Sequence, residues 1–195
     1  MATLSKACAF AALFILSFDA SGATDLDRRL LEAAQQADQT LVHELLDAGA
    51  DPNVRAADGS TPMIYAAHFG DTASVQALLE ANGDPNIANR YGIGPMHEAA
   101  LRAHAALLRM LLDAGAEVDL ALPEGETPLM LASQTSGADA VRLLIEHGAE
   151  VNVVEQWQGQ TPLMYAAAHD RGEVAALLIE AGADVNARTP VSTLP

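Results

Sequence analysis

Six histidines are the side chains of this 195-residue sequence best suited to hold a metal ion or to move a proton. They are His43, His68, His97, His104, His147 and His169. Zinc proteases carry two histidines four residues apart on one helix, with a glutamate between them as general base. No two histidines here have that spacing, and His97 and His104 lie seven residues apart, near opposite ends of one expected helix. The spacing therefore predicts no metal site.

The possible nucleophiles also have an explanation without catalysis. A catalytic serine or threonine needs a histidine base, an oriented acid and donors for an oxyanion. Thr61, Thr127 and Thr161 each stand directly before a proline, which is the arrangement of a helix N-cap. The glycines form no phosphate-binding loop or dinucleotide fingerprint, and the acidic residues lack calcium-loop spacing. We therefore expect a chain that is not an enzyme and needs no cofactor.

The balance of charge restricts the partners that the chain can have. Its formal net charge is −16, so nucleic acids and anionic lipid surfaces would be repelled by the general field. A basic or neutral protein is the easier partner to accommodate. Half of the residues are apolar and 4% are aromatic, so small aliphatic side chains must fill the core.

The first 23 residues have the pattern of a secretory signal. Lys6 gives a positive start, residues 7–18 are largely apolar, and Ser21, Gly22 and Ala23 are small enough for cleavage before Thr24. The alternative is a buried first helix. A membrane-spanning helix does not fit, because about twelve apolar residues are too few to cross a bilayer. We expect export to the periplasm, or secretion as the alternative, with no membrane anchor in the mature chain. The single cysteine, in position 8, would leave with the signal, so the mature chain would form no disulfide.

Two sequence markers recur with one period along the rest of the chain. The first is a Thr-Pro or Gly-Pro pair at 61, 94, 127 and 161, with spacings of 33, 33 and 34 residues. The second, close to Gly-Ala-Asp, begins at 49, 82, 115, 148 and 182, in phase with the first. A fixed period of this length indicates stacked structural repeats.

Each repeat has the pattern of two short antiparallel helices. Thr61 can cap the first helix and Pro62 fits its first position, where a missing N–H costs nothing. The second helix carries Val75, Leu78 and Leu79 at the spacing of one buried face. Gly115 then stands where a left-handed C-terminal cap is needed. The sequence predicts an all-α solenoid of stacked helix-turn-helix units.

At these residues the chain resembles the ankyrin repeat family, whose pattern runs D-x-x-G-x-T-P-L-H-x-A-A and then V-x-x-L-L-x-x-G-A-D-x-N. The resemblance covers about residues 25–188. It implies a protein that binds a protein partner in the groove between its turn tips and first helices, as a monomer by default. The divisions that it implies are a signal at 1–23, an N-terminal capping repeat at 24–50, ankyrin repeats at 51–83, 84–116, 117–149 and 150–188, and a tail at 189–195.

Several positions depart from the family pattern. The histidine is present only as His97, with Ile64, Met130 and Met164 at the matching positions. The glycine between paired helices is present only as Gly70, whereas the later repeats have residues 103 (Ala), 136 (Ser) and 170 (Asp), so we expect those loops to bend differently. The fourth repeat has one inserted residue around positions 155–157. No fifth helix pair follows, so repeat 4 either caps itself or is covered by something else.

Groove positions of the family fall on a set rich in the residue types that dominate binding hot spots. The candidate partner-binding residues are Arg55, Asp58, Ser60, Phe69, Arg90, Tyr91, Ile93, Arg102, Glu124, Glu126, Gln134, Trp157, Gln158, Gln160 and His169. Phe69 and Tyr91 are expected to contact a partner, because the family has no fixed apolar residue there. Trp157 either contacts the partner or packs the longer fourth turn against its neighbour.

Four roles remain open at this stage. A general interaction or stress-protection role competes with that of an acidic, immunity-like inhibitor that masks a basic toxin or hydrolase. A metal-binding or hydrolytic enzyme and a passive spacer are the alternatives of other classes.

Overall fold

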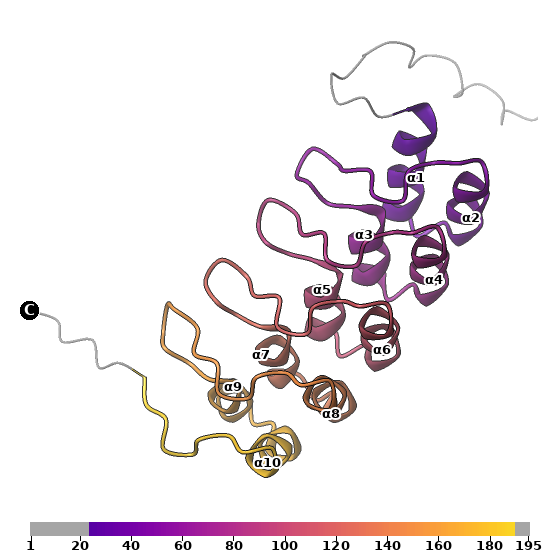
Figure 1. Ribbon diagram of the computed structural model, residues 1–195. Helices are drawn as coiled ribbons and strands as arrows, with labels where there is room; N and C mark the ends of the chain where they lie inside the picture. Colours follow the sequence, from indigo (N-terminus) through magenta and orange to yellow (C-terminus); the bar gives the residue numbers. More distant parts are fainter. Residues whose placement is uncertain (1–23, 190–195) are drawn as a thin grey trace, which may run out of the picture.

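The computed structural model describes residues 24–189, in which all regular secondary structure is helical (Figure 1). The helices are α1 (Asp25–Gln35), α2 (Gln39–Asp47), α3 (Pro62–Phe69), α4 (Thr72–Glu80), α5 (Pro95–Leu101), α6 (Ala105–Asp113), α7 (Pro128–Ser133), α8 (Ala138–Glu146), α9 (Pro162–Ala168) and α10 (Gly172–Glu180). The predicted all-α repeat solenoid is confirmed. The predicted export segment, residues 1–23, lies outside the described residues.

The helices form two parallel rows. Odd-numbered helices stack on one another in one row and even-numbered helices in the other, and each consecutive pair packs together (Figure 1). Between the pairs, the chain projects as four loops, which we call fingers 1 to 4: residues 51–60, 84–93, 117–126 and 150–160. We call the surface made by the fingers and the odd-numbered helices the finger face.

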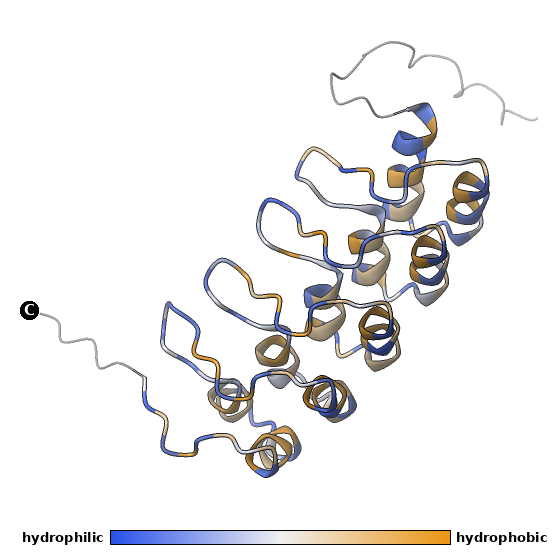
Figure 2. Cartoon of the chain, in the orientation of Figure 1, coloured by the Kyte–Doolittle hydropathy of each residue, from blue (hydrophilic) through white to orange (hydrophobic). Residues whose placement is uncertain are grey.

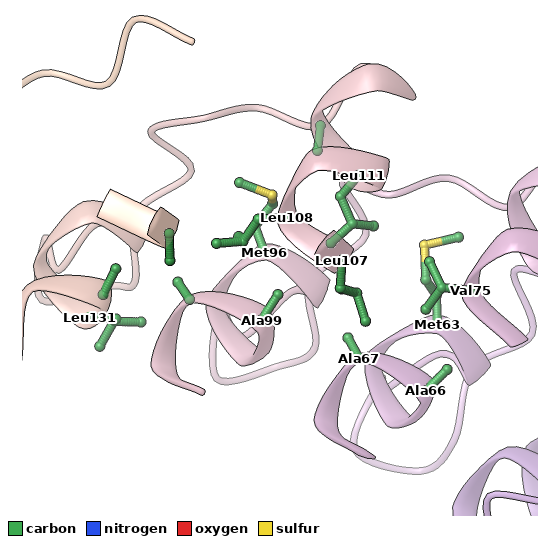
Figure 3. Packing of buried hydrophobic residues seen from close by; sticks show 14 of the residues in the cluster. Met63, Ala66, Ala67, Val75, Met96, Ala99, Leu107, Leu108, Leu111 and Leu131 are labelled. Carbon is green, nitrogen blue, oxygen red and sulfur yellow. The ribbon is translucent and has the colours of Figure 1, made fainter. Parts of the chain in front are cut away.

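Small and aliphatic side chains fill the space between the rows, as the low aromatic content predicts. Ala66 and Ala67 of α3 are almost fully buried and let neighbouring helices approach closely. Leu107, Leu108 and Leu111 of α6 are fully buried against them and their neighbours (Figure 3). Polar residues lie mainly in the fingers and on the outer faces of the helices, away from this core (Figure 2).

In repeats 1 to 4 the first helix begins at a proline, directly after its N-cap residue. Thr61, Thr127 and Thr161 each accept the backbone N–H three residues ahead, at 3.4 Å, as the sequence predicts. Gly94 takes the place of threonine before α5 and has no side chain to offer. There the side chain of His97 reaches back instead, and its Nδ1 accepts the Gly94 N–H at 3.0 Å. The histidine is therefore present in the one repeat that lacks the threonine cap.

The loops between paired helices differ less than the sequence suggests. Ala103 and Asp170 adopt the left-handed conformation of Gly70, with φ values of 54°, 56° and 68°. The prediction that the loops at 103 and 170 bend differently is therefore wrong. The backbone N–H that follows each left-handed residue is held at 2.9 Å by a carbonyl of the preceding helix in all three loops, and this bond fixes the turn.

The third loop alone departs from this geometry, as predicted for position 136. Ser136 is not left-handed. The hydroxyl of Thr135 bridges the loop instead: it donates to the Ala132 carbonyl at 2.7 Å and accepts the Gly137 N–H at 3.1 Å.

Asparagine side chains tie successive fingers together along one edge. Asn53 donates its amide N–H to the Asn82 carbonyl at 3.2 Å, and its Oδ1 accepts the Asp84 N–H at 2.7 Å. Asn86 and Asn152 make the same pair of bonds in their own repeats, at 2.7 to 3.1 Å. The matching position in the third repeat is Asp119, which has no amide to donate.

The last repeat leaves more apolar surface open than the others. Val174 and Leu178 of α10 are buried, but Ile179 is 50% exposed and Val185 is 61% exposed. The same helix also exposes charged side chains, Glu173 and Glu180. Polar residues therefore cover only part of the end of the stack.

Candidate functional site

The histidines are distributed through the fold as separate structural side chains. His43, His147 and His169 each pair through Nδ1 with the carbonyl four residues earlier in the chain. His97 is 2% exposed, and its Nε2 has no hydrogen-bond partner. Burial lowers the pKa of His97, and the nearby Leu120 backbone and the Glu98 carboxylate oppose this only in part. Across residues 24–189 no three His, Cys, Asp or Glu side chains are grouped so as to hold a metal ion.

Among the helices described, none is both long and apolar enough to cross a bilayer.

Backbone hydrogen bonds close the turn of each finger, and in fingers 1 to 3 a glycine N–H three residues along the turn makes a second bond, at 2.8 to 2.9 Å. Ala56, Asn89 and Leu122 donate to the carbonyl four residues ahead, at 2.8 to 2.9 Å. In finger 4, Glu155 donates to the Gln160 carbonyl, five residues ahead, at 3.0 Å. The inserted residue that the sequence indicates therefore lengthens the tip of finger 4.

Neighbouring fingers are linked at their tips, with one interruption. Arg90 donates its backbone N–H to the Asp58 carbonyl at 2.9 Å, and Gln156 donates to the Glu124 carbonyl at 2.8 Å. Pro123 occupies the equivalent position in finger 3 and has no N–H to give to finger 2. Fingers 1 and 2 are thus joined at the tip, as are fingers 3 and 4, and finger 2 meets finger 3 without this bond.

Cationic side chains on repeats 1 and 2 already have partners within the chain. The guanidinium of Arg90 donates to the Ala57 carbonyl, and that of Arg55 lies 3.5 Å from the Ala88 carbonyl. Arg102 approaches the Glu98 carboxylate at 3.6 Å.

The same Glu98 carboxylate also holds a histidine and, through it, an exposed aromatic ring. Glu98 Oε2 lies 3.0 Å from His68 Nδ1. His68 in turn packs edge-on against Phe69, with ring centroids 5.1 Å apart. The His68–Glu98 contact bridges α3 and α5 and leaves Phe69 half exposed.

On repeats 3 and 4 the finger carboxylates of Glu124 and Glu126 form no ion pair within the described residues, although Asp139 of α8 pairs with Arg142 at 2.8 Å. Tyr165 of α9 donates its hydroxyl to Glu126 Oε1 at 2.5 Å. Burial raises the pKa of Tyr165, and the bond to Glu126 and the charges of Glu126 and Glu155 raise it further. The Tyr165 hydroxyl therefore stays protonated and keeps the Glu126 carboxylate oriented.

Glu155 organises the tip of finger 4, a role that was not among the sequence predictions. Its side chain is 4% exposed, and its two oxygens accept the backbone N–H groups of Trp157, Gln158 and Gln160 at 2.6, 2.7 and 2.9 Å. Burial opposes ionisation, but these backbone bonds prevail and hold the pKa of Glu155 below its usual range. An acidic residue at the start of a lengthened turn was the only sequence sign of this arrangement.

Trp157 projects from this fixed tip into solvent. Its side chain is 80% exposed, so it does not pack the fourth turn against a neighbour. Of the two interpretations left open by the sequence, the packing one is therefore wrong.

The other candidate residues divide by exposure. The exposed ones are Arg55, Phe69, Arg90, Tyr91, Arg102, Glu124, Trp157, Gln158 and His169, and the half-buried ones are Asp58, Ile93, Glu126, Gln134 and Gln160. Ser60 is 3% exposed, and its hydroxyl bonds Asp58 at 2.9 Å and Asn89 at 3.1 Å, so this side chain supports fingers 1 and 2 from beneath the surface. Leu101, which the sequence set omits, is 45% exposed at the end of α5.

Stacked helix pairs with projecting fingers define the class of this protein: it is a helical repeat solenoid whose finger face exposes aromatic side chains. The family described as ankyrin repeats (3 copies) matches residues 30–121 and 104–189. The chain therefore belongs to the ankyrin repeat family. Repeats of this family typically mediate protein–protein interaction and are generally non-catalytic. A search of curated proteins finds no match to the sequence.

Proposed function

We propose that this protein is a non-catalytic interaction module that acts outside the cytoplasm and holds a protein partner on its finger face. The observation that carries the proposal is the exposure of three aromatic side chains on one face. Phe69 is 50% exposed, Tyr91 61% and Trp157 80%. Aromatic residues dominate binding hot spots, and keeping them in water has an energetic cost that the fold does not recover.

The three aromatic residues lie on rigid supports, which favours binding. Phe69 ends a stacked helix, Tyr91 donates its backbone N–H to Asn89 Oδ1 at 3.0 Å, and Trp157 is held through Glu155. Side chains on a fixed backbone lose less conformational entropy when a partner binds. The finger face therefore has the properties of a prepared contact surface.

A capture experiment tests this function. Purified protein is used as bait in a periplasmic extract, with Phe69→Ala, Tyr91→Ala and Trp157→Ala combined in one variant. The matched control combines Ile179→Ala and Val185→Ala, which remove exposed apolar side chains outside the set of candidate residues. We expect a specific partner to be captured by the wild type and the control and lost by the aromatic variant. Equal capture by all three proteins would contradict the proposal.

Export rests on the pattern of residues 1–23 and has its own measurement. Mass spectrometry of the protein from fractionated cells should find Thr24 or a near neighbour at the amino terminus, in the periplasmic fraction. A chain that keeps Met1 and stays in the cytoplasmic fraction would contradict this part of the proposal. Secretion into the medium is the alternative destination.

The second candidate function is that of an acidic, immunity-like protein that masks a basic toxin or hydrolase. The net charge of −16 favours it, as do the carboxylates of Glu124 and Glu126, which form no ion pair within residues 24–189. If this function is correct, the captured partner will be basic, and its activity will fall when the purified protein is added in equal amount. A captured partner that is acidic, or whose activity is unchanged, would favour the general interaction role.

A further inference from the structure

Charge is distributed unevenly along the finger face. In repeats 1 and 2, the guanidinium groups of Arg55, Arg90 and Arg102 rest on carbonyls or beside Glu98. In repeats 3 and 4, Glu124 and Glu126 form no ion pair with any residue of the described chain. Fingers 1 and 2 also carry acidic residues, but Arg55 and Arg90 offset part of that charge, whereas fingers 3 and 4 contain no lysine or arginine. The net negative charge of the fingers is therefore concentrated on the C-terminal half of the finger face.

Glu124 and Glu126 lie on the finger that adjoins the one carrying Trp157, the most exposed aromatic residue. The backbone bond from Gln156 to Glu124 joins fingers 3 and 4 side by side, one residue before Trp157. The bond from Tyr165 to Glu126 fixes the second carboxylate between finger 3 and α9. An indole and two carboxylates thus lie on adjoining segments.

Both kinds of group attract the same kind of ligand. The face of an indole ring attracts a cation through its quadrupole, and tryptophan does so best among the aromatic residues. Carboxylates pair with ammonium and guanidinium groups, and a half-buried carboxylate such as Glu126 does so with less screening by water. The net charge of −16 adds a field that draws a cationic segment toward the protein.

We propose that Trp157, Glu124 and Glu126 form a receptor for a lysine or arginine side chain on a basic segment of the partner. This inference rests on the proposed function and specifies the partner's chemistry at repeats 3 and 4. Trp157 stacks on the cation while the two carboxylates neutralise it. Glu155 is a positioning residue, because its buried carboxylate fixes the backbone that carries the indole.

Trp157 is the only tryptophan of the chain, so its fluorescence reports binding directly. The probe is a blocked octapeptide of alternating lysine and glycine, and the control peptide replaces lysine with glutamate. We expect a saturable change of Trp157 emission with the lysine peptide alone, and weaker binding in 0.5 M salt because screening shortens the range of the charges.

Two double variants with the same change in net charge separate a local receptor from the general field. Glu124→Gln with Glu126→Gln should weaken binding of the lysine peptide about 3- to 10-fold. Glu146→Gln with Glu173→Gln, on the outer helices, should change it less than about 2-fold. The midpoint of thermal unfolding shows that each variant folds. No emission change in the wild type, or equal weakening in both variants, would overturn the receptor.

The capture experiment separates this inference from the proposed function. If the triple aromatic variant loses the partner, while the lysine peptide fails to bind and Glu124→Gln with Glu126→Gln still captures the partner, the finger-face function stands and the cation receptor is overturned. If the peptide binds as expected but the aromatic variant captures the partner unchanged, the receptor chemistry stands and the proposed function fails.

Discussion

The carboxylate of Asp119 faces the backbone N–H of Glu150, with its two oxygens 3.2 and 3.1 Å from that nitrogen. Asparagine at the matching position of three other repeats accepts one such N–H and also donates to a carbonyl, as Asn86 does to Gly115 at 3.1 Å. An ionised aspartate cannot donate. The third link along this edge therefore has one bond fewer than its neighbours.

Asp119→Asn should stabilise the protein by about 1 kcal/mol at pH 7, because the new amide can donate to the carbonyl of Gly148. This corresponds to a rise of about 2–4 °C in the unfolding midpoint, measured by circular dichroism. Burial raises the pKa of Asp119, so the folded state holds its proton more tightly than the unfolded state does. Stability is therefore lost as the pH rises through the range between the unfolded and folded pKa values of Asp119. The gain from Asp119→Asn should accordingly shrink toward pH 4.

The reverse substitution is the control. Asn86→Asp replaces the same kind of donor in the preceding repeat and should lower the midpoint by a similar amount. A variant Asp119→Asn that is no more stable than the wild type would show that the missing bond carries no free energy.

His97→Met should make the free energy of unfolding less dependent on pH in the acid range. The unfolded imidazole titrates near about pH 6.5, whereas the buried one resists protonation, so the unfolded state binds more protons below that pH. Stability of the wild type should fall as the pH drops below about 6.5, by at most about 1.4 kcal/mol per pH unit from this group. Methionine is the residue at the matching position of repeats 3 and 4 and fits this core. Urea midpoints at pH 7 and pH 5 measure the effect, and His43→Met, on an exposed ring, should keep the wild-type difference.

Gly94→Thr should raise stability by about 0.5–1 kcal/mol, because it adds a cap and reduces the freedom of the unfolded chain. The backbone at Gly94 already has the conformation of a threonine cap, because φ is −111° at Gly94 and −99° at Thr61. A Cβ at Gly94 would meet no atom closer than 3.5 Å. Gly92→Ala is the opposing control, since φ there is 79° and a Cβ would lie 2.6 Å from Pro123 Cδ. Urea titration of both variants should give midpoints that move in opposite directions, and a lower midpoint for Gly94→Thr would refute the capping argument.

The features that the sequence predicted correctly are those set by neighbouring residues. A threonine cap followed by proline starts α3, α7 and α9 because both act within one turn. The 33-residue spacing of these starts is enough to indicate the stack, since each helix pair can bury its apolar face only against the next pair.

The features that the sequence missed depend on how individual turns close. Ala103 keeps a left-handed turn without glycine because its own N–H and that of His104 are hydrogen-bonded to carbonyls of α5, which holds the turn in place. Position 137 of the next repeat must be glycine, because a Cβ there would lie 2.2 Å from the Ala103 Cβ. Glu155 and Trp157 belong to one finger, but their roles follow from how the longer tip closes, which residue types alone do not specify.

Glu155→Gln should loosen the tip of finger 4 without unfolding the stack. A neutral amide oxygen accepts N–H bonds more weakly than a carboxylate, so the loss should be about 1–2 kcal/mol, confined to this tip. Hydrogen exchange at Trp157, Gln158 and Gln160 should become about tenfold faster, and the fluorescence anisotropy of Trp157 should fall. Glu124→Gln, on the adjoining finger, removes an exposed carboxylate and should leave both unchanged.

The pH dependence of the wild type tests the same arrangement. Because the pKa of Glu155 is lowered, its contribution to the order of the tip is fully present above the usual glutamate pKa, about 4.3, and is lost only as the pH falls through the lower folded value. Trp157 anisotropy should therefore persist through the ordinary titration of exposed glutamates and drop at more acidic pH, whereas Glu155→Gln should show the low value throughout. Unchanged exchange and anisotropy in Glu155→Gln would mean that the backbone of finger 4 holds the indole without this carboxylate.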